Sequence, residues 1–374
     1  MAGIYVHIPF CRSKCAYCGF FSLASEKRMA DFVLALKREI IARNGYLGDD
    51  KVETIYFGGG TPSLLPISLV EEILALLREN FEITSNPEMT LEVNPDTVDK
   101  EYLLSLKNMG FNRISVGIQS FHDDDLKYLD RRHDSKHALQ VIDDLKSVGF
   151  EKLTLDLIYG IPTLTEEKWN ENLDIFFSTG ISHLSAYALT VEPKTILDKR
   201  IEKGDLQDVS EDDAVRHYEI LVERAKENGF EHYEISNFAK EGCRSRHNSI
   251  YWKDEKYLGL GPSAHSYDGK SRQWNVSNLS DYIRTAGLSS DCYEMEVLSL
   301  EDRFNEYVMT SLRTSWGCDI DKIMSDYGMS CRDHFLKNVG KYLETGVMLK
   351  RDKAFVLTEK GMLFADGIAS DLFL

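Results

Sequence analysis

The chain has 374 residues, with 44 basic and 61 acidic side chains and a formal net charge of -17. Hydrophobic residues make up 43% of it, enough for a packed core, so a disordered chain is excluded. The acidic excess argues against nucleic acids and anionic membranes as partners, because both require clusters of Lys and Arg. No run of about 18 apolar residues occurs, so no membrane span is predicted.

The N-terminus and the cysteines indicate the compartment. The first ten residues have the pattern of a strand and lack the charged start and long apolar core of a signal peptide. We therefore expect a cytoplasmic protein. Three of the seven cysteines, Cys11, Cys15 and Cys18, lie within eight residues. Disulfides are rare in the cytosol, so metal ligation is the first role to consider for these thiols.

Apolar, β-branched runs alternate with amphipathic stretches over the first 228 residues. Strands are predicted at 3–8, 52–57, 89–93, 113–118, 152–158 and 183–189, and helices at 26–43, 68–80, 99–109, 135–148, 166–178 and 210–228. Such alternation predicts a parallel sheet with right-handed crossovers. Six units are fewer than the eight of a closed barrel. The predicted fold is therefore α/β, a partial TIM-like (β/α)6 barrel.

The pattern changes after residue 229. One more strand is predicted at 231–238, then loops rich in aromatic residues at 242–269, and finally helices at 301–312, 319–327 and 331–344 with a hairpin at 347–357. Three helices and a hairpin predict a winged-helix-like module. Its acidic side chains slightly outnumber the basic ones, so DNA binding is not expected. The predicted domains are a core at 1–235, a loop-rich connection at 236–299 and a C-terminal module at 300–374.

The spacing Cys-x3-Cys-x2-Cys follows the first predicted strand directly. A structural zinc site normally has four ligands in two pairs, and no second pair with that spacing follows. Iron–sulfur clusters are usually held by four thiolates. Three thiolates on a 4Fe–4S cluster would leave one iron open to another ligand. Zinc and three unrelated buried thiols remain alternatives, but the spacing favours a cluster.

Polar residues follow the predicted parallel strands where each strand ends. They are Gly59, Gly60 and Thr61 after the second strand, Glu92 in the third, Gln119 in the fourth, Asp156 in the fifth and Tyr187 in the sixth. The carboxyl ends of parallel strands share one edge, where active sites form. The planar guanidinium group of Arg131 could bind a carboxylate through two parallel hydrogen bonds. The simpler interpretation is that Arg131 lies on a solvent-exposed face of a helix. Sheet-end packing could explain each residue singly, whereas their convergence favours a ligand site.

The segment Tyr5-Val6-His7-Ile8-Pro9-Phe10-Cys11 through Cys18 resembles the start of radical S-adenosylmethionine proteins, and more narrowly the oxygen-independent coproporphyrinogen III oxidase family. The resemblance implies a 4Fe–4S cluster on the three cysteines and S-adenosylmethionine chelated at the open iron. In that superfamily one electron from the cluster cleaves the sulfonium to a 5′-deoxyadenosyl radical. The resemblance also implies that the following residues line the S-adenosylmethionine site: Tyr5, Tyr17, Gly59, Gly60, Thr61, Glu92, Gln119, Arg131 and Asp156.

Two departures from the oxidases resemble the haem chaperone branch of that family. The oxidases have a further cysteine where this chain has Phe20, and an N-terminal extension where this chain starts two residues before its first strand. The branch also has a segment similar to residues 247–252, whose histidine is implicated in haem binding. Imidazole is a natural axial ligand of haem iron. His247 is thus the expected haem ligand, with a loop histidine bonded to backbone as the alternative.

The resemblance implies a haem chaperone that binds haem and passes it to an apo-haemoprotein, reached at the membrane through a partner. The alternative is a true coproporphyrinogen III oxidase of porphyrin biosynthesis, which would decarboxylate coproporphyrinogen III to protoporphyrinogen IX. The sequence does not decide whether the protein is an enzyme, because the same residues would bind S-adenosylmethionine with or without turnover.

Overall fold

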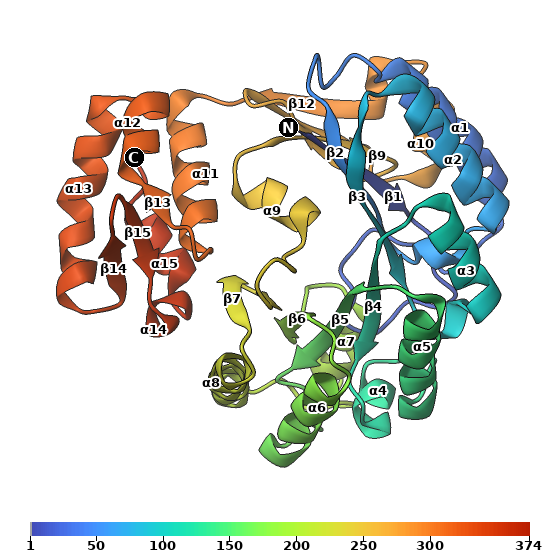
Figure 1. Ribbon diagram of the computed structural model, residues 1–374, viewed down its shortest axis with the longest axis horizontal. Coiled ribbons are helices and arrows are strands. Elements are labelled where there is room, and N and C mark those ends of the chain that lie inside the picture. Colours follow the sequence, from blue (N-terminus) through green and yellow to red (C-terminus); the bar gives the residue numbers. More distant parts are fainter. Residues whose placement is uncertain (1) are drawn as a thin grey trace.

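The computed structural model describes residues 2–374, and its first half is built from alternating strands and helices (Figure 1). The strands are β1 (Ala2–Ile8), β2 (Val52–Gly59), β3 (Ile83–Val93), β4 (Arg113–Gln119), β5 (Lys152–Tyr159) and β6 (His183–Ala188). Each strand pairs in parallel with the next. The predicted partial (β/α)6 barrel is confirmed.

Helices follow every one of these strands. They are α1 (Met29–Ala42), α2 (Ile67–Asn80), α3 (Lys100–Met109), α4 (Asp123–Tyr128), α5 (Ser135–Val148), α6 (Glu166–Ser178), α7 (Ile196–Glu202) and α8 (Glu211–Glu227). Figure 1 shows α1, α2, α3 and α5 along the outer side of the curved sheet. The short helices α4 and α7 were not predicted. Gly110 and Gly149 end α3 and α5 in the left-handed conformation, which glycine adopts at no steric cost.

Residues 231–238 do not form the single strand that was predicted. They form a hairpin of β7 (Glu231–Glu234) and β8 (Asn237–Ala239), and β8 pairs antiparallel with β6. The turn is stabilised by the Glu234 carboxylate, which accepts hydrogen bonds from the Ser236 amide at 3.1 Å and from the Asn237 side chain. These local side-chain bonds compete with a continuous strand and explain the error.

Residues 236–299 are not loop-rich, contrary to the prediction. They contain α9 (Arg246–Trp252), β9 (Lys256–Leu260), β10 (His265–Tyr267), β11 (Ser271–Asn275), α10 (Leu279–Thr285) and β12 (Tyr293–Val297). β9 pairs in parallel with β1, and β10 to β12 continue antiparallel. These strands are short and carry many polar residues, which hid their pattern. The domain boundaries stay a prediction.

Within residues 2–374 one sheet of twelve strands results, in the order β12-β11-β10-β9-β1-β2-β3-β4-β5-β6-β8-β7. β1 therefore lies inside the sheet, with a parallel neighbour on each side. Figure 1 shows α9 on the inner side of the curved sheet, opposite the outer helices. The described residues include no helix that is both long and apolar enough to cross a membrane.

The C-terminal part is a helical module with a small sheet, as predicted. It contains α11 (Leu300–Leu312), β13 (Cys318–Asp319), α12 (Ile320–Tyr327), α13 (Met329–Glu344), β14 (Met348–Arg351), β15 (Ala354–Leu357), α14 (Glu359–Met362) and α15 (Ala365–Ser370). It is the orange and red part of Figure 1, next to α9. The amide of Ser315 donates to the carbonyl of Tyr233 at 2.9 Å, which joins the module to β7.

Candidate functional site

A cavity of about 630 Å³ lies at the carboxyl ends of the parallel strands. Its lining includes Cys11, Cys15, Cys18, Tyr17, Gly59, Gly60, Thr61, Glu92, Gln119, Arg131 and Asp156. All eleven were named from the sequence as site residues. The structure thus brings together residues at the ends of β2, β3, β4 and β5, in the loop after β1 and in the segment between α4 and α5. Tyr5 and His247, also predicted, are not among the lining residues.

The cysteine loop is fixed to its surroundings by backbone and side-chain bonds. The Cys11 amide donates to the Leu23 carbonyl at 2.9 Å. The Thr61 hydroxyl donates to the Cys11 sulfur, and Arg131 Nη1 donates to the Cys15 sulfur, both at 3.5 Å. Donors of this kind stabilise a thiolate over a thiol. Two of the three sulfurs therefore accept a hydrogen bond from a neighbouring side chain.

The donor set fits a cluster better than a single ion. Within residues 2–374 no three His, Cys, Asp or Glu side chains lie close enough together to hold one metal ion. A 4Fe–4S cluster is larger than an ion, so its sulfur ligands stand apart around it, and thiolates are its usual ligands. Burial raises the pKa of the Cys11 and Cys18 thiols, so metal binding would release their protons.

The glycine run after β2 brings the chain against the cysteine loop. The Gly60 amide donates to the Ile8 carbonyl at 2.8 Å, and the Thr61 amide donates to the Phe10 carbonyl at 2.7 Å. A Cβ on Gly60 would lie 2.7 Å from the Phe10 carbonyl oxygen and 3.1 Å from the Cys11 sulfur. Gly59 has φ = 108°, a conformation that favours glycine. Larger residues would push the two loops apart.

Two acidic side chains face the cavity from β3 and β5. Glu92 accepts hydrogen bonds from the Tyr56 hydroxyl at 2.7 Å and the Gly59 amide at 3.2 Å. Asp156 accepts one from Ser115 at 3.2 Å. Burial raises the pKa of each carboxyl to about 7. Carboxylate oxygens accept hydrogen bonds from hydroxyl and ammonium groups, so the pair suits the sugar or amino group of a nucleoside ligand.

Arg131 lies on the cavity wall and does not face bulk solvent, which rules out its simpler interpretation as part of a solvated face. Its Nη2 donates to the Asn94 side chain at 2.9 Å and to the Gly117 carbonyl at 2.6 Å. Its buried Nε has no hydrogen-bond partner within residues 2–374. Gln119 has φ = 71° at the irregular end of β4. Such backbone strain is concentrated at ligand sites.

His247 lies in a helix and not in the loop that was predicted for residues 242–269. It lies on α9 with its side chain buried, Nδ1 2.7 Å from the Thr54 hydroxyl and Nε2 2.9 Å from the Tyr251 hydroxyl. Its ring stacks on Tyr56 with centroids 4.9 Å apart. Burial lowers the pKa of His247 to about 3. Both ring nitrogens have partners here, so its role as a haem ligand stays a prediction.

Tyr5 lies in the barrel interior below the cavity, where its hydroxyl is 3.0 Å from His7 Nδ1. The same ring stacks beside His247 at 6.4 Å. Tyr56, which contacts both rings, was missed from the sequence. Residues 52, 54 and 56 alternate along β2 and share one face, but a core residue would show the same alternation. Tyr5 and Tyr56 thus form a layer between the cavity and α9.

Apolar residues at the mouth were also missed. Phe20, noted only as a departure from a family pattern, is 69% exposed and lines the cavity. Leu189 lines it just after β6, next to Tyr187, which was expected at the end of that strand. The cavity is therefore apolar on one side of its mouth and polar deeper inside, where Glu92 and Asp156 lie. A ligand with a flat apolar part and a polar part suits such a cavity.

The fold and the cysteine cavity define a radical S-adenosylmethionine protein. Residues 5–176 match the Radical SAM superfamily, and residues 298–364 match the HemN C-terminal domain. In structure, the chain is similar over its whole length to a protein described as "Coproporphyrinogen III oxidase (HemN) from Escherichia coli is a Radical SAM enzyme", with a TM-score of 0.86, 24% identity and 90% of that chain covered. At this identity the likeness shows the fold alone.

Closer relatives in sequence are named Heme chaperone HemW. The protein of Bacillus subtilis is 32% identical over 98% of this chain and 98% of its own length. That of Mycobacterium tuberculosis is 32% identical over 99% of this chain and 94% of its own length. The chain belongs to the HemW family of radical S-adenosylmethionine proteins. Membership implies a 4Fe–4S cluster and S-adenosylmethionine.

Proposed function

We propose that the protein is a cytoplasmic haem chaperone, which binds haem and delivers it to an apo-haemoprotein. The observation that carries the proposal is the end-to-end match with proteins named Heme chaperone HemW. The acceptor in this proposal is an apo-haemoprotein, including one that resides in a membrane. The cavity at the strand ends supports the same conclusion, because its donor set is the one expected of this family.

Within this proposal, the residues of the cavity have separate roles. Cys11, Cys15 and Cys18 hold a 4Fe–4S cluster, which supplies an electron and one open coordination position when bound. Glu92 and Asp156 accept hydrogen bonds from the hydroxyl and ammonium groups of S-adenosylmethionine. The other lining residues have positioning roles. The backbone at Gly59, Gly60 and Thr61 holds the end of β2 against the cysteine loop, and Tyr17, Gln119 and Arg131 complete the wall.

Haem binding is assigned to α9, with His247 as the iron ligand. Tyr251 is 36% exposed and the Trp252 side chain is half-buried, so flat side chains are available next to the histidine. Ligation of iron requires His247 to give up its partner Tyr251 or Thr54. Binding therefore involves a rearrangement of α9.

The rival function is that of a coproporphyrinogen III oxidase. The fold does not separate the two functions, because the structural likeness to HemN is at 24% identity. The position of Phe20 favours the chaperone, since the oxidases have a cysteine there. The apolar mouth next to Phe20 would admit a tetrapyrrole in either case, so only turnover discriminates.

The test uses full-length protein reconstituted anaerobically with iron and sulfide. It is incubated with S-adenosylmethionine, a reductant and coproporphyrinogen III, and in parallel titrated with haem. We expect a saturable Soret change with haem and no protoporphyrinogen above the level of a Cys11→Ala/Cys15→Ala/Cys18→Ala control. Product formation in many turnovers, or no Soret change, would overturn the proposal.

A further inference from the structure

Three hollows follow one another through the barrel. The cofactor cavity is followed by a polar cavity of about 50 Å³ inside the barrel and by a pocket of about 310 Å³ outside α9. Glu92 and Asp156 line both the first and the second, and Ser245 lines both the second and the third. The helix α9 therefore stands between the cofactor site and an outer pocket.

A chain of direct contacts connects the cofactor cavity to α9. Glu92 accepts from the Tyr56 hydroxyl at 2.7 Å, so the tyrosine fixes the carboxylate that faces the cofactor cavity. The Tyr56 ring lies on the His247 ring, 4.9 Å between centroids and 24° between planes. His247 in turn bonds Thr54 at 2.7 Å and Tyr251 at 2.9 Å. A movement of His247 must therefore change the packing of Tyr56.

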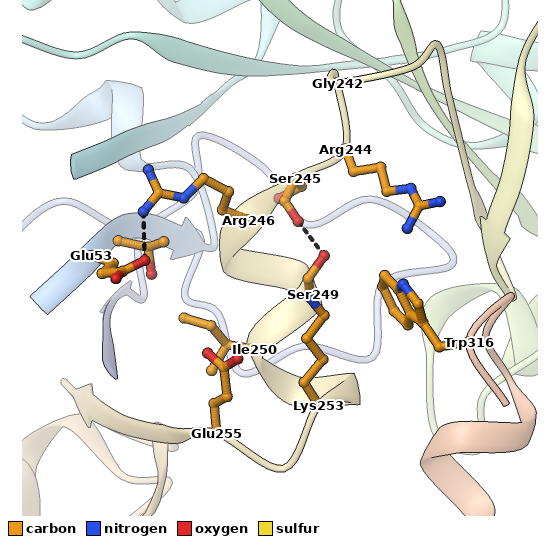
Figure 2. A pocket seen from close by; sticks show the side chains of 11 residues that line it. Glu53, Gly242, Arg244, Ser245, Arg246, Ser249, Ile250, Lys253, Glu255 and Trp316 are labelled. Atoms are coloured by element: carbon orange, nitrogen blue, oxygen red, sulfur yellow. Dashed lines mark hydrogen bonds and ion pairs between the residues drawn. The ribbon is translucent and has the colours of Figure 1, made fainter. Parts of the chain in front are cut away.

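The outer pocket gives a ligand access to α9. Figure 2 shows Ser249 of α9 and Lys253, the residue after that helix, on one side of it and Arg244 and Trp316 on the other. The Arg244 guanidinium and the Lys253 ammonium lie 5.2 and 5.0 Å from the centre of the Trp316 ring. Cations on an aromatic face and an open volume suit a ligand that is flat and carries carboxylates. Such a ligand would contact the helix that holds His247.

We propose that α9 positions Glu92 through His247 and Tyr56, so that a ligand which moves His247 lowers the affinity for S-adenosylmethionine. Tyr56 and His247 are positioning residues in this scheme, since neither lines the cofactor cavity. Only the identity of the ligand as haem rests on the proposed function. Coupling between two binding equilibria is reciprocal, so S-adenosylmethionine must lower the affinity for that ligand by the same factor.

The first test needs no haem. The Kd of S-adenosylmethionine is measured by equilibrium dialysis on reconstituted protein with matched iron and sulfide content. Tyr56→Phe removes the hydroxyl and keeps the ring, so we expect a Kd about tenfold higher, because a hydrogen bond to a charged group is lost. The matched control is Tyr282→Phe, whose hydroxyl donates at 2.6 Å to the buried Glu39 outside the site. A Kd within twofold of the wild type for Tyr56→Phe would overturn the proposal.

Variants of His247 separate positioning from general damage. His247→Ala should raise the Kd of S-adenosylmethionine several-fold, and His247→Phe, which keeps a flat ring against Tyr56, should restore part of the affinity. Thermal unfolding of each variant shows whether it is folded. If neither His247 variant folds, the comparison of Tyr56→Phe with Tyr282→Phe still tests the proposal, because each of these two substitutions removes only one oxygen atom.

The second test adds haem. In wild-type protein, saturating haem should raise the Kd of S-adenosylmethionine about fivefold or more, and S-adenosylmethionine should raise the Kd of haem by the same factor. In Tyr56→Phe the two ligands should bind nearly independently. Haem binding that leaves the Kd of S-adenosylmethionine unchanged would contradict the coupling. An absence of haem binding would contradict the proposed function alone, since the first test stands without it.

Discussion

At the scale of single residues, Gly60 shows why the cofactor cavity depends on small side chains. Its α-carbon is packed between two loops, so a Cβ would lie 2.7 Å from the Phe10 carbonyl oxygen and 2.9 Å from the Ile8 carbonyl oxygen. Backbone atoms cannot rotate away as a long side chain can. The cysteine loop and the end of β2 therefore hold their distance only while residue 60 lacks a side chain.

We expect Gly60→Ala to lower the iron and sulfide bound per chain after reconstitution. The added methyl also pushes on the backbone next to Cys11, at a cost of about 1–3 kcal/mol in the free energy of unfolding. Metal analysis and denaturant unfolding measure both effects. Gly45→Ala is the control, because a Cβ at Gly45 has no atom within 4 Å. If Gly60→Ala binds as much iron and sulfide as the wild type, the two loops can move apart without loss of cluster binding.

Nine of the eleven cavity residues were predictable because strand ends and cysteine spacing are local signals. Arg131 was proposed from the chemistry of its guanidinium group, and Tyr17 only from the family resemblance. Tyr56 was not found, since an inward tyrosine in a buried strand has the same pattern as a core residue. The position of His247 was also not predictable, because its burial depends on Thr54, which is nearly two hundred residues earlier in the chain. Contacts over such distances leave no periodic trace in the sequence.

At the scale of elements, α9 is held inside the barrel by one buried ion pair. Arg113 on β4 bonds Glu88 on β3 at 3.1 Å, with both side chains at most 2% exposed. Its Nη2 donates to the carbonyls of Cys243 and Arg244 at 2.8 and 3.0 Å. Glu88 accepts from the His247 amide at 3.0 Å. The pair thus binds the segment before α9 as well as the first turn of that helix.

Arg113→Ala should lower the free energy of unfolding by about 3–5 kcal/mol, because it leaves the Glu88 carboxylate buried without its partner. The carbonyls at 243 and 244 lose their donor as well, so proteolysis should begin in residues 240–255. Denaturant unfolding and mass spectrometry of short digests measure the two effects. Arg284→Ala, which breaks an exposed pair with Asp281, should change neither. Protection of residues 240–255 in Arg113→Ala would mean that α9 is held by other contacts.

Apart from α4 and α7, the helices and strands up to α8 followed from the alternation of strand and helix patterns, and most of their bounds agree within a few residues. Those between residues 231 and 299 did not. β8 has three residues and β10 has three, so neither is long enough to show a period of two. They form because β6 and β9 offer unpaired edges, and that is a property of the assembled sheet. The positions of β8 and β10 are therefore determined by long-range strand pairing and not by the local sequence pattern.

At the scale of the whole molecule, buried carboxyl groups make stability depend on pH. Burial raises the pKa of Glu92, Asp156 and Glu234 to about 7. The folded protein therefore binds more protons than the unfolded chain between about pH 4.5 and 7. Each group then contributes a loss of stability as the pH rises through that window. Buried histidines such as His133, with a pKa lowered to about 4, act in the opposite direction below pH 6.5.

Glu234→Gln isolates one of these groups outside the cofactor cavity. Relative to wild type, the variant should gain about 3 kcal/mol in the free energy of unfolding between pH 5 and pH 8, because it has no carboxyl to ionise. Urea unfolding at both pH values measures the difference. Glu344→Gln, at an exposed position on α13, should show no such gain. An equal pH dependence in Glu234→Gln and wild type would show that Glu234 ionises freely.

The central place of β1 has a consequence for synthesis on the ribosome. Its partner β2 follows within about fifty residues, but its other partner, β9, begins only at Lys256. At 5–20 residues per second, translation of the intervening chain takes roughly 12–50 s. Throughout that interval the nascent polypeptide displays its thiols beside an unpaired strand edge. Iron loading and protection from aggregation are therefore problems of the growing chain before they are problems of the finished one.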